Sequence, residues 1–105
     1  MNFISVGYGN IINIDRLIAI MSSNSAPARR LITEARANGL CIDTTMGRRT
    51  KEILVMDSAH VIMSALHVAT LSQRIQAVNN GTPQDIADEK FDEAPDDGDE
   101  EGEDD

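Results

Sequence analysis

The sequence predicts an α+β domain, in which a small, mainly antiparallel sheet carries two helices and an acidic disordered C-terminal tail follows. Three observations predict this class. Short apolar runs separated by turn residues indicate strands with tight connections. Two segments, Ala26–Asn38 and Ala69–Val78, repeat apolar residues at helical spacing. From residue 81 onward the chain is almost wholly polar and acidic, so it cannot support a core. The predicted order is β-β-α-β-β-β-α.

Charge divides the 105 residues into two parts. Residues 1–80 hold eight lysines and arginines against five acids, a net charge of +3, whereas residues 81–105 hold thirteen acids and one lysine, a net charge of −12. We therefore expect a mildly basic domain over residues 1–80 and a disordered tail over residues 81–105, an asymmetry that is common in nucleic-acid-binding proteins. A domain of about 80 residues buries only a modest fraction of its surface, so self-association is expected.

The N-terminal segments are predicted to be β-structure. Phe3–Val6 is a short apolar run, and Gly7 and Gly9 indicate a turn or bulge beside it. The apolar pattern resumes over Ile11–Ile14. A second strand is predicted over Arg16–Met21, and because it holds few polar residues we expect it to be covered on both sides.

The clearest helix is Ala26–Asn38. Ser25 is a suitable N-cap, Pro27 fits only in the first turn, and Gly39 ends the helix. Its apolar residues recur at i, i+3, i+4 and i+7 and predict one buried stripe: Ala28, Leu31, Ile32 and Ala35.

Three strands and a second helix follow. Leu40–Thr45 alternates weakly, and a turn separates it from the continuous apolar run Ile53–Met56. A tight turn then leads into Val61–Met63. The helix Ala69–Val78 is predicted to bury one face, formed by Leu71, Ile75 and Val78.

The strongest local signal for function is a cluster of cations after Gly47. Arg48, Arg49 and Lys51 stand at a turn between strands, where side chains project from the core. The arginine fork binds phosphate bidentately, keeps its charge, and also matches guanine in the major groove. The alternative interpretation is a solvated basic turn. Further cations strengthen the expectation of nucleic-acid binding. Arg16 begins an apolar strand, and three arginines of the helix Ala26–Asn38 lie outside its buried stripe and face solvent: Arg29, Arg30 and Arg36.

The sequence predicts no enzyme, no cofactor and no metal site. His60 and His67 have no Cys, His or acid at a metal-ligand spacing. Asp57, Ser58 and His60 are the residue types of a catalytic triad, but they are packed into four positions and we expect turn and strand residues instead. Cys41 is expected to be a small core residue.

The same composition bears on location. One cysteine excludes an internal disulfide and fits a reducing compartment. No signal sequence and no apolar run of about 20 residues is present, so no membrane association is expected. A cytoplasmic protein is predicted.

Several segments together resemble the bacterial extracellular-matrix regulatory protein family typified by RemA, in register over about residues 3–75. They are Gly7–Ile12, Arg16 with the apolar strand after it, Ser25–Pro27, Gly39–Asp43, Gly47–Thr50 and Val55–Ala65. The resemblance implies a DNA-binding transcriptional regulator of biofilm matrix genes and a ring-like homo-oligomer. It also implies that Arg16, Arg48 and Arg49 contact double-stranded DNA, with Arg30 and Lys51 as additions. Met46 departs from the family, whose members often have an aromatic residue before the Gly-Arg-Arg turn.

Other interpretations stay open. The runner-up is an oligomeric protein-interaction scaffold whose basic face binds an acidic partner. RNA binding ranks third because exposed aromatics are scarce, and an enzyme ranks last. The acidic tail is either a solubility tail or a mimic of nucleic acid that competes for the arginine cluster.

Overall fold

The computed structural model describes residues 2–81, and the predicted acidic tail from residue 82 onward lies outside the described residues. The described part is an α+β structure, which confirms the predicted class. In chain order its elements are β1 (Phe3–Gly7), β2 (Asn10–Asn13), the 3-10 turn η1 (Ile14–Arg16), β3 (Leu17–Ser22), α1 (Ala26–Ala37), β4 (Cys41–Asp43), β5 (Glu52–Met56), β6 (Val61–Ser64) and α2 (Val68–Asn79).

The predicted order differs from the structure by one strand, because Asn10–Asn13 forms a strand of its own. It pairs antiparallel with β1 as a separate two-stranded sheet. Tyr8 and Gly9 both have positive φ, at 56° and 81°, as a two-residue hairpin turn requires. Asn10 Nδ2 also donates to the Gly7 carbonyl at 2.9 Å. The turn expected at Gly7 and Gly9 is therefore confirmed.

The larger sheet has the order β3-β5-β6-β4. β3 and β6 both run antiparallel to β5, whereas β4 runs parallel to β6. The sheet is thus mainly antiparallel, as predicted, with one parallel pair that the sequence does not indicate. The loop over residues 44–51 connects β4 to β5, and it crosses the end of β6, which lies between them in the sheet. Because β5 and β6 then form an antiparallel hairpin, β6 runs in the same direction as β4.

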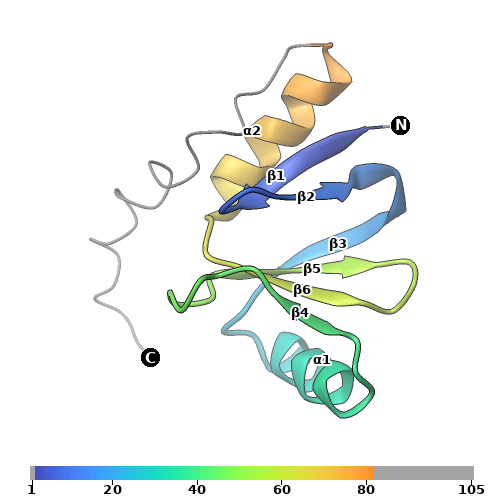
Figure 1. The fold of residues 1–105 in the computed structure, drawn as a ribbon, viewed down its shortest axis with the longest axis vertical. Helices are drawn as coiled ribbons and strands as arrows, with labels where there is room; N and C mark the ends of the chain where they lie inside the picture. Colours follow the sequence, from blue (N-terminus) through green and yellow to red (C-terminus); the bar gives the residue numbers. More distant parts are fainter. Residues whose placement is uncertain (1, 82–105) are drawn as a thin grey trace.

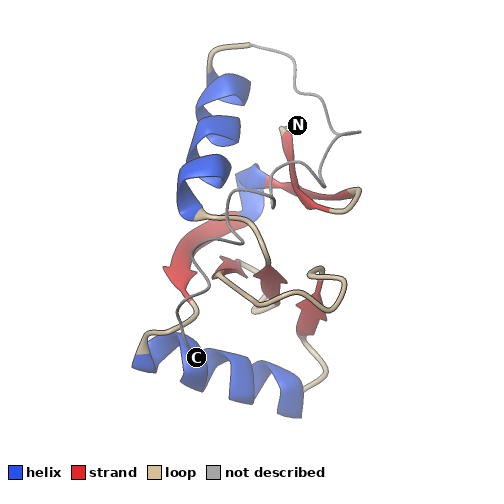
Figure 2. Ribbon diagram, turned by 90° about the vertical axis from the view of Figure 1, so that its left-hand side faces the viewer, coloured by secondary structure: helices blue, strands red, loops and turns tan. Residues whose placement is uncertain are grey.

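Both faces of this sheet are packed (Figures 1 and 2). The β1–β2 hairpin and α2 lie on one face and α1 lies on the other. Leu54 and Ile62 contribute to a core with Ile4, Val6, Leu66 and Leu71. The alternate residues Ile53, Val61 and Met63 form a second core with Ala28 and Ala35 of α1. Burial on two sides explains why β5 is a continuous apolar run instead of an alternating one.

Local signals place α1 as predicted. Ser25 Oγ accepts the Ala28 N–H at 3.2 Å, Pro27 lies in the first turn, and Gly39 has a φ of 73° after the helix ends. Ala28 and the other three residues of the predicted stripe all lie in or against the second core. The helix positions three arginines on its outer surface.

One prediction about β3 is wrong. The strand was expected to be covered on both sides, but it lies at an edge of the sheet and Ile18 is 66% exposed. The physical reason is the position of α1, which packs mainly along β4 and β6 and leaves the face of β3 open at the Ile18 end. The chain by itself therefore leaves the Ile18 side chain in contact with solvent.

Candidate functional site

The predicted DNA-contacting residues lie at two opposite ends of the larger sheet. Arg16 directly precedes β3, and its neighbour Leu17 pairs with Met56 at the far end of β5. Lys51 directly precedes β5, and its neighbour Glu52 pairs with Ser22. The length of β5, five residues or roughly 17 Å, separates the two ends. Arg16 is therefore not brought together with Lys51 in one chain.

We call the Lys51 end the cationic end. A tight turn over Thr45–Arg48 displays its arginines, because Met46 and Gly47 both have positive φ, at 52° and 81°. The Arg48 N–H donates to the Thr45 carbonyl at 3.0 Å and closes the turn. Arg48 is exposed, whereas Arg49 is partly buried, as is Lys51.

The start of α1 joins the same end. Ser23, which precedes the helix, donates through its backbone N–H to the Lys51 carbonyl at 3.1 Å and through Oγ to the Thr50 carbonyl at 2.7 Å. The exposed side chains of Arg29 and Arg30 follow in the first turns of α1. The structure thus gathers four of the five predicted residues, Arg30, Arg48, Arg49 and Lys51, at one end, and it adds Arg29.

Acids close to the cationic end are held by other contacts. Glu52 is buried, and its Oε2 accepts the Val68 N–H at 2.9 Å. Asp43 accepts hydrogen bonds from Thr45, at 2.6 Å from Oγ1 and 2.8 Å from the backbone N–H. These bonds, with a smaller contribution from the charge of Arg36, lower the pKa of Asp43. The carboxylate therefore stays ionised and fixes the strand end from which the turn begins.

At the other end, Arg16 is held by a residue that sequence reasoning missed. Its Nε donates to both carboxylate oxygens of Asp57, at 3.0 and 2.9 Å, and both side chains remain substantially exposed. Because these bonds use only Nε, they leave Nη1 and Nη2 for another ligand. The two residues are 41 positions apart, so no local pattern could have indicated the pair.

The triad-type residues Asp57, Ser58 and His60 do not form a relay. Ser58 Oγ lies 2.6 Å from His60 Nδ1, but the Asp57 carboxylate binds Arg16 and does not orient the histidine. Cys41 is partly buried, with its Sγ 3.4 Å from Met63 Sδ. Within residues 2–81 no group of three potential metal ligands is found. In the same range no helix is long and apolar enough to cross a membrane.

Known proteins resemble the chain over about three quarters of its length. The family described as RemA-like, Extracellular matrix regulatory protein A-like, matches residues 3–75. Three similar proteins each bear the name "Putative regulatory protein". The one from Carboxydothermus hydrogenoformans is 46% identical over 80 residues, which cover 76% of this chain and 92% of the relative. The Bacillus pumilus protein is 48% identical over 75 residues (71% and 84%), and the Natranaerobius thermophilus protein is 40% identical over 86 residues (82% and 97%).

Proposed function

Because the chain belongs to the RemA-like family of regulatory proteins, we propose that it is a non-enzymatic transcriptional regulator that binds double-stranded DNA through arginines displayed on a homo-oligomer. The domain that does so comprises residues 1–80, and residues 81–105 form a separate acidic tail. The protein acts in the cytoplasm and needs no cofactor.

The observation that carries the proposal is the cationic end. Arg48, Arg49 and Lys51 lie with the first turns of α1 in a domain of net charge +3. Cations on a turn and on an adjoining helix start can contact successive phosphates of a duplex, and such contacts release counterions. Arginine adds bidentate bonds to phosphate or guanine. Only Phe3 and Tyr8 are aromatic among the described residues, so stacking on single-stranded bases is not favoured.

Arg16 supports the proposal only if chains assemble. It lies at the opposite end of the sheet, so one duplex contacts Arg16 together with Arg48 and Arg49 most directly when two copies meet end to end. Repetition of a weak cationic surface in an oligomer raises affinity through avidity, by about 10²–10⁴ without any new contact.

The proposal is tested by fluorescence anisotropy of a labelled duplex with the full chain and an R48A/R49A double variant. We expect the double variant to bind DNA at least tenfold more weakly. Its affinity should also depend less on salt, because each lost phosphate contact makes the slope of log K against log salt shallower by about 0.9. The control is Arg74→Gln, which removes one positive charge on α2 together with the 3.2 Å bond from Arg74 Nη1 to the Ser5 carbonyl, so its melting temperature is measured alongside.

Two results contradict the proposal. One is equal DNA affinity of the double variant and the wild type, with melting temperatures unchanged. The other is absence of duplex binding by the wild type at low salt. Binding of an acidic polypeptide in place of DNA then favours the alternative function, an interaction scaffold whose basic face meets an acidic partner.

A further inference from the structure

An apolar pocket lies on the hairpin face of the larger sheet, at the end where Arg16 stands, and we call it the Arg16 pocket. Its volume is about 260 Å³, slightly less than that of a pocket for a drug-sized molecule. Four strands supply its apolar walls: Ile12, Ile42, Met56 and Ile62. Ile42 pairs in register with Ile62 and is 45% exposed, so solvent reaches the pocket beside it. The size and lining suit a small molecule with an apolar body.

Hydrogen-bond donors without partners line the same pocket. Arg16 binds Asp57 through Nε alone, and Asn13 uses its Oδ1 to accept the Asp15 N–H at 3.0 Å. Among the residues that the structure describes, the Nη groups of Arg16 and the Nδ2 group of Asn13 therefore have no hydrogen-bond partner. An arginine and an amide that both offer N–H groups to one hollow match a ligand rich in acceptors.

Ser58 and His60 add one more donor to the rim. Ser58 Oγ lies 2.6 Å from His60 Nδ1, and both residues line the pocket. If Nδ1 accepts the hydroxyl proton, the ring carries its own proton on Nε2 and can donate there. If Nδ1 carries the proton instead, the Ser58 hydroxyl is released to donate. Either tautomer leaves one donor for a ligand.

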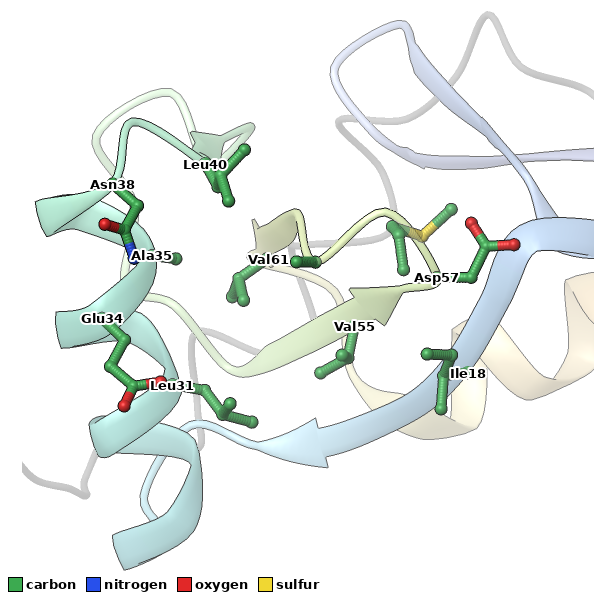
Figure 3. A pocket seen from close by; sticks show the side chains of 11 residues that line it. Ile18, Leu31, Glu34, Ala35, Asn38, Leu40, Val55, Asp57 and Val61 are labelled. Atoms are coloured by element: carbon green, nitrogen blue, oxygen red, sulfur yellow. The ribbon is translucent and has the colours of Figure 1, made fainter.

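The guanidinium of Arg16 is held in place before any ligand binds. The Asp57 N–H donates to the Arg16 carbonyl at 2.8 Å, and the Asp57 carboxylate accepts from Nε. Figure 3 shows the Asp57 side chain at the end of β5, next to the start of β3. A positioned side chain loses less conformational entropy on binding, which favours affinity.

The neighbouring hollow on the α1 face, drawn in Figure 3, has a different character. Its charged lining residues are Glu34 and Asp57, both acids. The Arg16 pocket instead combines an arginine with neutral donors. An anion is therefore expected on the hairpin face of the sheet and not on the α1 face.

We propose that the Arg16 pocket binds a small carboxylate with an apolar body. The fork of Arg16 matches the two oxygens of a carboxylate, and the apolar walls cover the rest of the molecule. Asp57 offsets the charge of Arg16, so a singly charged carboxylate fits better than a doubly charged phosphate monoester. The lining residues all belong to one chain, so the site is complete without a second copy.

The ligand and the duplex compete for the same arginine. A carboxylate on the Nη groups of Arg16 occupies the donors that would otherwise meet a DNA phosphate, so the ligand weakens duplex binding. This consequence rests on the proposed DNA binding, whereas the pocket does not. The site would make the regulator responsive to a small organic acid.

The test uses phenylacetate as the probe and its neutral analogue phenylacetamide, which has the same ring and lacks the charge. Titrations followed by saturation-transfer difference NMR on the full chain measure both affinities. Ile42→Asp places a carboxylate beside the pocket, at a position that solvent already reaches. Ile11→Asp is the matched control, because Ile11 is 48% exposed on β2 and does not line the pocket. Circular dichroism melts check that both variants fold.

We expect the wild type and Ile11→Asp to bind phenylacetate equally, and Ile42→Asp to bind it at least about tenfold more weakly. Phenylacetamide should bind the wild type at least about tenfold more weakly than phenylacetate, as for the loss of a hydrogen bond between charged groups. This comparison needs no variant. Absence of phenylacetate binding, equal binding of the amide, or undiminished binding by a folded Ile42→Asp chain overturns the proposal.

Duplex binding is measured on the same samples at constant ionic strength. Phenylacetate should weaken it in the wild type and in Ile11→Asp, and have at least about tenfold less effect at equal concentration in Ile42→Asp. Phenylacetate binding by a chain that does not bind DNA contradicts only the proposed function. DNA binding without phenylacetate binding contradicts only the pocket, and binding of both without competition contradicts the shared use of Arg16.

Discussion

Replacement of Glu52 by glutamine tests how α2 is attached to the larger sheet. Glu52 opens β5, is 7% exposed, and accepts the N–H of Val68, the first residue of α2, at 2.9 Å. The N-cap residue His67 makes no capping hydrogen bond with its side chain. A carboxylate from a distant strand therefore pairs an N–H group at the helix N-terminus and meets the positive end of the helix dipole.

The magnitude follows from these contacts. A hydrogen bond to a charged group contributes about 1.5–3 kcal/mol and a neutral one about 0.5–1.5 kcal/mol. Glutamine keeps the size and an acceptor, so it loses roughly the difference, together with about 0.3–1 kcal/mol from the dipole. The easier desolvation of the neutral amide offsets part of this loss. We expect Glu52→Gln to lower the free energy of unfolding by about 1–2 kcal/mol, and the melting temperature by about 4–8 °C for each kcal/mol.

Thermal and urea unfolding measure this loss. The control is Asp15→Asn, which also removes one negative charge but at an exposed position whose side chain accepts an exposed hydrogen bond from Asn2. It is expected to change the free energy of unfolding by no more than about 0.5 kcal/mol. A Glu52→Gln variant as stable as the wild type, or more stable, would refute the reasoning, because desolvation of the carboxylate would then outweigh its bond to the helix.

Two further perturbations probe the turns. Ala59 has a φ of 75° in the β5–β6 turn, a backbone conformation that costs an alanine about 1–2 kcal/mol. Glycine adopts it freely, but its greater flexibility in the unfolded chain cancels about 0.5–1 kcal/mol of this gain. Ala59→Gly should therefore raise the free energy of unfolding, measured in urea melts, by roughly 0.5–1 kcal/mol. A lower value contradicts the strain argument. Asp43 should titrate by NMR below the ordinary aspartate pKa of about 3.9, because the Thr45 hydroxyl and N–H stabilise the carboxylate. The lowered pKa of Asp43 stabilises the folded state fully above a pH of about 3.9, and this stabilisation is lost as the pH falls through the lowered value. Replacement of Thr45 by valine removes the hydroxyl donor and should return the pKa of Asp43 toward about 3.9.

The elements that local chemistry specifies were predicted well. Ser25, Pro27 and Gly39 specify the ends of α1, and the spacing of its apolar residues specifies its buried face. The predicted helix ends at Asn38 and the observed one at Ala37, with Asn38 as the C-cap. For α2 the N-terminal signal comes from Glu52, sixteen residues earlier in the chain, so the sequence placed its start one residue late.

Features that depend on strand order were not predictable in the same way. β4 has only three residues, too few to show a period, and its parallel partner β6 is eighteen residues away. The separation of Arg16 from Arg48 and Arg49 follows from the directions of β3 and β5, which composition does not reveal. The Arg16–Asp57 pair is equally non-local. The cluster at the cationic end was predictable because three of its members are close neighbours in sequence.

The most direct test of the account is the salt dependence of duplex binding by the full chain and by a chain that ends at Gly81. We expect both chains to bind duplex DNA, with log K falling linearly with log salt by about 0.9 for each phosphate contacted. Tighter binding by the shorter chain would in addition show that the acidic tail competes with DNA. Binding that is absent at low salt, or insensitive to salt, would contradict the claim that this regulator holds duplex DNA through its cationic end.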